Sequence, residues 1–308
     1  MSAARLPVTV IGGYLGAGKT TLVNHLLRHA AGRRLAVLVN DFGALPIDAA
    51  LIEGADGDVL SLAGGCICCS YGSDLVGALI DLPGRAPHVE HVLIETSGVA
   101  LPGAVSSTLS LLAGYRLDAV VVVADAETVR QRAVDPYMAD TIARQLAAAD
   151  LVLLNKADLV TSDALAGAET FVAGAAPTAR ILRTRHAATP IDIVLGARRP
   201  TQPSGTALRT PGQADAASLY ESLHLDMPAR LDLGRLGAAL VEPTLGIVRA
   251  KGLLHDCDGT LRALHIVGTR WSVDSAPAGS TAHGLVLIGL RGAFDGGRVR
   301  ATLTAMAA

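Results

Sequence analysis

Short apolar runs alternate with amphipathic stretches over the first two-thirds of this chain. The runs are rich in Val, Ile and Leu, which is typical of strands buried on both faces, and they lie at 8–11, 35–40, 91–95, 119–125, 151–155 and 179–182. The stretches between them predict helices at 19–29, 73–81, 102–113, 137–148 and 163–174. This alternation predicts an α/β fold with a parallel sheet covered by helices on both faces. Ligands of such sheets bind at the carboxyl ends of the strands.

The pattern changes near residue 199. From 199 to 217 the chain is rich in Pro, Gly, Ser, Thr and Gln and has no apolar period, which indicates a linker. Beyond it, a helix is predicted at 229–241 and strands at 245–250, 261–267 and 285–290, with Trp271 in the core. The sequence therefore predicts a first domain at 1–198, a linker at 199–217 and a smaller α+β domain at 218–308.

Charge and cysteine content narrow the function classes. The chain has 308 residues with 26 basic and 28 acidic side chains and no block of like charge, so nothing predicts a surface for nucleic acid or anionic lipid. The first residues lack a secretory signal, and the apolar runs are too short to span a bilayer, so we expect a soluble protein. Three of the four cysteines are clustered, which favours thiol chemistry in a reducing cytoplasm over a disulfide framework.

Residues 13–20 spell Gly-x4-Gly-Lys-Thr directly after the first predicted strand and before a predicted helix. Glycines allow successive backbone N–H groups to surround phosphate oxygens, and the helix adds the positive end of its dipole. Lys19 then supplies charge to the β- and γ-phosphates, and Thr20 supplies a hydroxyl to Mg²⁺. The alternative is an ordinary glycine-rich turn. The motif predicts a nucleoside triphosphate site whose phosphate-binding residues are Gly13, Gly16, Ala17, Gly18, Lys19 and Thr20.

Asn155-Lys156-Ala157-Asp158 follows another predicted strand and favours guanine as the base. The Asp158 carboxylate can accept hydrogen bonds from the guanine N1–H and exocyclic amine, donors that adenine does not present in this arrangement. A polar turn after a strand is the alternative for this tetrapeptide alone.

Two further strand ends carry acids. Glu95-Thr96-Ser97-Gly98 closes the strand at 91–95, so Glu95 can orient the attacking water or hold Mg²⁺ through a water, and Gly98 can offer an N–H to the γ-phosphate. Asp41 follows the strand at 35–40 and is expected to reach the metal or the phosphates. The alternatives are a strand-capping glutamate and an Asp turn.

Cys66-Ile67-Cys68-Cys69 follows a Gly-Gly pair and brings three thiols within four residues. Thiolates select Zn²⁺, Cu(I) and similar ions, so Cys66, Cys68 and Cys69 are candidate metal ligands. A redox pair at Cys68 and Cys69 is the main alternative. Cys257 is expected to be a lone turn residue, and His88 and His91 to be surface residues more than ligands.

Four of these segments together resemble the CobW-type GTPases, relatives of the urease and hydrogenase metallochaperones. They are the glycine-rich segment at 12–21, Gly-Gly-Cys-Ile-Cys-Cys at 64–69, Glu-Thr-Ser-Gly at 95–98 and Asn-Lys-Ala-Asp at 155–158. The C-terminal segment with Trp271 also looks like that family's second module. Many members carry Asn-Glu-Phe-Gly-Glu where this chain has Asn-Asp-Phe-Gly-Ala at 40–44, and this chain lacks their histidine-rich tract.

The resemblance implies a cytoplasmic enzyme that binds GTP, Mg²⁺ and a transition metal, with zinc as the first choice, and it adds Thr21 to the residues that hold the phosphates and Mg²⁺. It implies that GTP hydrolysis releases metal from Cys66, Cys68 and Cys69 to a client metalloprotein, through a loop around Asp41, with Glu95 as the catalytic or γ-phosphate-sensing carboxylate. Two alternatives remain: a GTP-dependent switch that acts on a protein partner without metal, and an ATP-dependent enzyme with a fortuitous Asn-Lys-x-Asp. Whether the protein forms a homodimer is left open.

Overall fold

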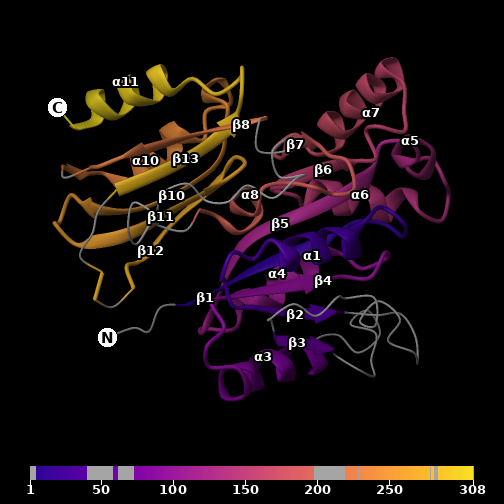
Figure 1. Cartoon of the computed structure of the whole chain (residues 1–308), viewed down its shortest axis with the longest axis horizontal. Coiled ribbons are helices and arrows are strands. Elements are labelled where there is room, and N and C mark those ends of the chain that lie inside the picture. Colours follow the sequence, from indigo (N-terminus) through magenta and orange to yellow (C-terminus); the bar gives the residue numbers. More distant parts are fainter. Residues whose placement is uncertain are drawn as a thin grey trace. The chain divides into compact units, whose positions relative to one another are not determined.

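Seven parallel strands form the first sheet, which is drawn in Figure 1 for the computed structural model of this chain. The structure describes residues 5–39, 58–61, 73–197, 219–227, 229–277, 279–280 and 284–307. In sheet order β3-β2-β4-β1-β5-β6-β7, the strands are β1 (Leu6–Gly12), β2 (Leu35–Val39), β3 (Asp58–Ser61), β4 (His91–Glu95), β5 (Tyr115–Asp125), β6 (Leu151–Asn155) and β7 (Arg180–Arg183). The predicted parallel α/β sheet is confirmed, and β3 is a strand that the sequence pattern missed.

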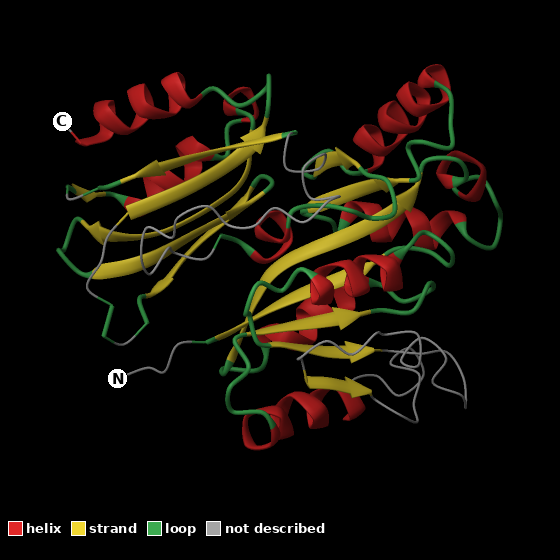
Figure 2. Cartoon of the chain, viewed as in Figure 1, coloured by secondary structure: helices red, strands yellow, loops and turns green. Residues whose placement is uncertain are grey.

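Helices cover both faces of this sheet, as Figure 2 shows. They are α1 (Lys19–Arg28), α3 (Ser73–Arg85), α4 (Pro102–Ser110), α5 (Val129–Arg132), α6 (Ala139–Ala147) and α7 (Ser162–Ala175). On one face, Leu75 and Leu79 of α3 and Val105 of α4 pack with alternate residues of β1, β2 and β4. The inner strands of the sheet, from β2 through β4, β1 and β5 to β6, are therefore buried by helices. This burial explains their nearly continuous apolar sequences.

A second unit spans Thr189 to the C-terminus, while the first spans Arg5–Ala188. Its sheet has the order β12-β11-β10-β13-β8, and β9 pairs with β10. Its elements are α8 (Ile191–Leu195), β8 (Tyr220–Leu225), β9 (Arg230–Leu231), α10 (Leu233–Leu240), a short 3₁₀ helix (Pro243–Leu245), β10 (Ile247–Asp256), β11 (Leu261–Val267), β12 (Arg270–Ser275), β13 (Gly284–Leu290) and α11 (Gly296–Ala307). The expected linker at 199–217 lies outside the described residues, so the domain limits remain predictions.

The core of the second unit lies between its sheet and two helices. Leu233, Leu236 and Leu240 of α10 and Val299 of α11 are buried there. Trp271 packs against this core as a half-buried side chain. A Cβ at Gly237 would lie 2.5 Å from the indole ring, so the ring lies directly against the backbone of α10.

The predicted helix at 229–241 was wrong at its start. Residues Arg230–Leu231 form β9, and α10 begins after Asp232, whose carboxylate accepts a hydrogen bond from the Arg235 N–H at 2.9 Å. An aspartate at this position satisfies an N–H group that has no partner within the helix. The predicted strand at 245–250 likewise begins later, at Ile247, and extends to Asp256.

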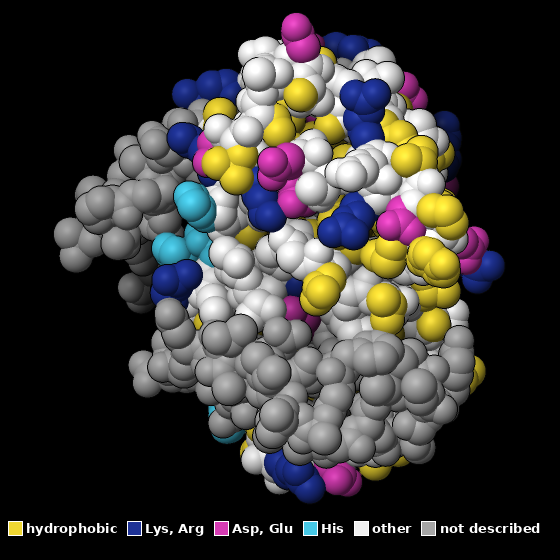
Figure 3. All heavy atoms as spheres, turned by 90° about the vertical axis from the view of Figure 1, so that its right-hand side faces the viewer, with side chains coloured by type: hydrophobic (Ala, Val, Ile, Leu, Met, Phe, Trp, Pro, Cys, Tyr) yellow, Lys and Arg dark blue, Asp and Glu magenta, His cyan; other side chains and the backbone are white. Residues whose placement is uncertain are grey.

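The surface of the described residues is mixed in charge. On the face seen in Figure 3, Lys and Arg side chains lie among Asp and Glu side chains, with apolar side chains between them. Within the described ranges, no helix combines the length and apolar character needed to cross a bilayer.

Candidate nucleotide site

The phosphate loop connects β1 to α1 at the centre of the sheet, between the ends of β4 and β5. Gly13 has a φ of 129°, and a Cβ there would overlap the carbonyl oxygen of Val123 in β5. Gly18, with a φ of 110°, is the N-cap of α1, and no described side chain caps this helix end. The first-turn N–H groups of any helix have no intrahelical partner, and because no described side chain caps α1, this helix end suits an anionic ligand. Gly16 and Thr21 are exposed, and Ala17 is buried.

Lys19 extends back along the loop that it follows. Its side chain is 7% exposed, and its Nζ donates to the carbonyl oxygen of Tyr14 at 3.3 Å. The ammonium group is thus held above the phosphate loop by a backbone acceptor and does not extend into solvent. This is the position from which a lysine can reach a phosphate bound by the loop.

Thr20 and Glu95 contact each other across the end of the sheet. Thr20 Oγ1 donates to Glu95 Oε1 at 2.7 Å, and Glu95 is 1% exposed at the end of β4. Strand pairing explains the contact, because Ile11 of β1 lies opposite Glu95 in the register. A hydroxyl and a carboxylate are oxygen ligands of the kind that Mg²⁺ takes, so these residues fit that ion. The roles of Glu95 in sensing phosphate or orienting water remain predictions.

The segment after β4 approaches the phosphate loop closely. A Cβ at Gly98 would lie 2.7 Å from the backbone nitrogen of Leu15, so only glycine fits without a backbone shift. Thr96 is fastened to β1, because its N–H donates to the carbonyl oxygen of Ile11 at 2.9 Å. The structure therefore brings Gly98 beside the phosphate loop.

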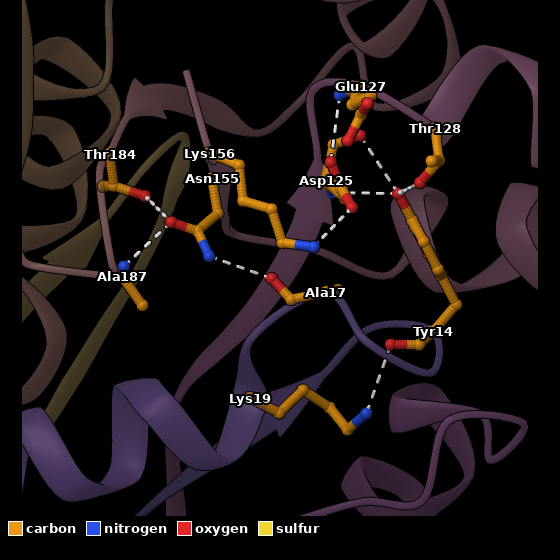
Figure 4. A network of polar contacts seen from close by, with 10 residues as sticks. All are labelled: Tyr14, Ala17, Lys19, Asp125, Glu127, Thr128, Asn155, Lys156, Thr184 and Ala187. Carbon is orange, nitrogen blue, oxygen red and sulfur yellow. Dashed lines mark hydrogen bonds and ion pairs between the residues drawn. The ribbon is translucent and has the colours of Figure 1, made fainter. Parts of the chain in front are cut away.

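Asn155 joins the phosphate loop to the end of β7 (Figure 4). Its Nδ2 donates to the carbonyl oxygen of Ala17 at 2.9 Å. Its Oδ1 accepts from the Ala187 N–H at 2.8 Å and from the Thr184 hydroxyl at 3.2 Å. The side chain is 2% exposed, and its contacts are to protein groups. Asn155 thus orients two loops, and direct contact with a base remains a prediction.

Lys156 and Tyr14 both contact Asp125, at the end of β5 (Figure 4). Lys156 Nζ forms an ion pair with Asp125 Oδ2 at 2.8 Å. The Tyr14 hydroxyl accepts from the Asp125 N–H at 2.8 Å and donates to the Asp125 carbonyl oxygen at 3.0 Å, with Thr128 Oγ1 at 3.2 Å. Burial raises the pKa of Tyr14 to about 12, so the phenol stays neutral at physiological pH. The phosphate loop and the Asn155-Lys156 loop are therefore connected through Asp125.

Asp158 follows this loop and is exposed. It shares the carboxyl edge of the sheet with the phosphate loop, because parallel strands β1, β5 and β6 end on the same side. Its expected contact with guanine remains a prediction.

The expected thiol site lies outside the described residues, as do Asp41, Cys66, Cys68 and Cys69. In the part of the chain that the structure describes, no group of three or more His, Cys, Asp or Glu side chains could hold a metal. Cys257 is an exposed turn residue whose hydrogen bond to Asp256 raises the pKa of its thiol. His88 is exposed, but His91 is buried, with its Nε2 2.8 Å from Thr9 Oγ1, so the surface interpretation of His91 was wrong.

Sequence reasoning missed three buried polar residues around the nucleotide loops, namely Tyr14, Asp125 and Gln145. Each had a signal in the sequence. Tyr14 is an aromatic residue inside a phosphate loop, and Asp125 ends a long apolar run. Gln145 stands at helical spacing between the apolar residues Ile142 and Leu146.

Tyr14→Phe is expected to lower the free energy of unfolding by about 1–2 kcal/mol at pH 7, because the Asp125 N–H loses its acceptor. The pKa of Tyr14 is raised on folding, so its contribution to stability is complete below about pH 10 and is lost as the pH rises toward 12. The stability gap between wild type and variant should therefore narrow over that range. Urea unfolding at pH 7 and pH 11 measures this gap. Tyr137→Phe, at an exposed side chain, is the control, and equal effects of both variants would contradict the role of Tyr14.

The sequence of this chain is similar to those of several known proteins. The family model described as CobW/HypB/UreG, nucleotide-binding domain, matches residues 7–183. The chain is 37% identical to the zinc chaperone CobW of Pseudomonas aeruginosa, over 63% of this chain and 60% of that protein. It is 36% identical to the zinc chaperone YjiA of Escherichia coli, over 50% of each chain.

A third relative is the zinc-regulated GTPase metalloprotein activator 1 of Schizosaccharomyces pombe, at 31% identity over 59% of this chain and 46% of that protein. The chain thus spans between 46% and 60% of the length of these curated relatives. The crystal structure of Zn(II)-bound YjiA GTPase from E. coli aligns with 98% of this chain and 99% of that chain at 22% identity and a TM-score of 0.46.

Proposed function

Because this chain belongs to the CobW/HypB/UreG family, we propose that it binds and hydrolyses GTP and couples this reaction to transfer of a transition metal to a client metalloprotein. Zinc is the first choice of metal, since two relatives are named zinc chaperones and thiolates bind zinc well. A cluster of three cysteines of this kind suits the reducing cytoplasm. The observation that carries the nucleotide part is the joining of the phosphate loop to Glu95 on one side and to Asn155 on the other.

In this proposal the loop N–H groups and Lys19 bind the phosphates, and Asp158 selects guanine. Thr20, with Glu95 behind it, would hold Mg²⁺, which supplies positive charge to the phosphates. Phosphoryl transfer depends on positioning and charge more than on covalent chemistry, so the hydrogen bond between Thr20 and the buried Glu95 supports catalysis by fixing the loop. Lys19, Glu95 and Asp41 are the proposed catalytic residues.

The metal part rests on the thiols and on chain topology. Cys66, Cys68 and Cys69, together with Asp41, are the proposed metal ligands. Support comes from β2 and β3, which end at Val39 and Ser61 on the same edge of the sheet as the phosphate loop. The chain segments that contain Asp41 and the three cysteines therefore start from that edge. A cysteine binds the metal as its thiolate and not as its thiol, so we expect tighter binding as the pH rises.

The test is steady-state GTP turnover with and without one equivalent of Zn²⁺. We expect zinc to change turnover in the wild type and in Cys257→Ser, and to have no effect on Cys68→Ser. Cys257 is the matched control because it is an exposed, isolated cysteine. GDP binding by all three proteins checks that the nucleotide site is intact.

Each outcome separates one part of the proposal. A zinc response in Cys68→Ser equal to that of the wild type would remove Cys68 from the metal site. No zinc response in any protein, with GTP turnover intact, would favour the metal-independent switch. Equal turnover of ATP and GTP would contradict guanine selection.

A further inference from the structure

Gln145 is a buried amide on the inner face of α6. Its side chain is 1% exposed and lies on the same helical face as Ile142 and Leu146. Its Nε2 donates to the carbonyl oxygens of Gly98 at 3.1 Å and of Ala100 at 2.9 Å. Both acceptors are backbone carbonyls, so the amide must present its NH₂ group to them. A buried amide is costly without such bonds, and this pair satisfies its NH₂ group, while its Oε1 has no hydrogen-bond partner among the described residues.

The segment that Gln145 holds is the one that follows Glu95. Thr96 is bonded to Ile11 of β1, and Gly98 lies against the backbone of Leu15 in the phosphate loop. Gln145 adds a third attachment, to α6. A peptide group is planar, so a bond to the Gly98 carbonyl also sets the direction of the following N–H. Gln145 therefore determines how the segment from Gly98 to Ala100 faces the phosphate loop.

Helix α6, which carries Gln145, is followed in the chain by β6, the strand that ends at the Asn155-Lys156 loop. After α6, Asp150 is bonded to Val120 of β5 through its Oδ2 at 2.7 Å and through its N–H at 2.9 Å. Strand β6 then begins at Leu151 and ends at Asn155. Gln145 thus connects the segment beside the phosphate loop to the element that positions Asn155, Lys156 and Asp158.

We propose that Gln145 is a positioning residue for GTP hydrolysis, which orients the backbone of residues 98–100 toward the γ-phosphate. This rests on the GTP hydrolysis proposed above and is independent of metal transfer. Without the two bonds, the segment keeps its attachment to β1 through Thr96 and the bond from the Ala100 N–H to Ser97, but the carbonyls of Gly98 and Ala100 lose their fixed direction. Nucleotide binding uses the phosphate loop and the Asn155 loop, so it survives, whereas the hydrolytic step loses its geometry.

The test compares Gln145→Met with Gln131→Met. Methionine keeps the length of the side chain and removes both donors, and Gln131 is an exposed glutamine on α5. We expect Gln145→Met to lower kcat on the order of 10- to 100-fold while the KM for GTP and the Kd for GDP change by less than about threefold. Gln131→Met should match the wild type. Wild-type kcat in Gln145→Met, or a loss of GDP binding equal to the loss of kcat, would overturn the proposal.

Gln145→Glu gives a second readout that packing alone does not predict. A glutamate beside two carbonyl oxygens in a buried position has a raised pKa. At low pH its protonated form regains one donor, so its kcat relative to wild type should rise as the pH falls. A constant ratio across the pH range would contradict the proposal. If the wild type itself does not hydrolyse GTP, the proposed function fails before this inference is reached.

Discussion

Asp158→Asn is expected to change the base preference of this protein from guanine to xanthine. In the proposed site the aspartate carboxylate would accept two hydrogen bonds from guanine, whereas an asparagine presents an NH₂ donor where guanine also has a donor. Xanthine has a carbonyl oxygen at that position and accepts the bond. An unpaired donor in a recognition site costs about 1–3 kcal/mol, which is roughly 5- to 150-fold in discrimination, so we expect the ratio of kcat/KM for GTP and XTP to invert.

Because Asp158 is exposed, the substitution should leave folding unchanged, and the melting temperature provides that check. Asp163→Asn, at an exposed residue in the first turn of α7, is the matched control and should keep the preference for GTP. If Asp158→Asn still prefers GTP, or if both variants lose activity alike, then Asp158 does not recognise the base.

Gly13→Ala is expected to destabilise the first unit by about 3 kcal/mol or more and to abolish nucleotide binding. Two costs add at this position. A φ of 129° is unfavourable for any residue with a side chain, and the new Cβ would overlap the Val123 carbonyl oxygen in β5. Relief requires the phosphate loop to move away from β5, which also breaks the contacts of Tyr14 with Asp125.

The free energy of unfolding, measured in the absence of nucleotide, separates the loss of stability from the loss of nucleotide binding. Gly16→Ala is the control, because Gly16 also has a positive φ, of 79°, but a Cβ there has nothing within 4 Å. We expect that variant to lose about 1–2 kcal/mol from backbone strain alone. Equal stability losses in the two variants would show that the contact with Val123 does not matter.

The elements that the sequence predicted well are those with a strong local pattern. The strand at 261–267 and the strand at 91–95 have the predicted bounds, because each is an apolar run between polar turns. Weak patterns were missed. Strand β3 has four residues, and β12 places Trp271 and Val273 on a strand whose burial depends on α10. The predicted start of α10 was wrong because the pairing of Arg230–Leu231 with β10 outweighed a helical apolar pattern.

The same difference between local patterns and long-range contacts applies to the candidate site. The phosphate loop and the Asn-Lys-x-Asp loop were predicted because their chemistry lies in contiguous residues. The sequence did not predict that Asn155 would bond to Ala17, or that Lys156 would pair with Asp125. These partners are distant in the chain and meet because β5 lies between β1 and β6.

By itself, the sequence determined the parallel α/β architecture and the place of the phosphate loop, because hydrophobic period and glycine placement act over a few neighbouring residues, and it proposed the residues for guanine and Mg²⁺. Only the tertiary structure decided which polar groups hold these loops together. Tyr14 and Gln145 contact segments far away in the chain, and strand order and helix packing select their partners. A buried polar group must find a hydrogen-bond partner, and which partner it finds is a property of the folded chain.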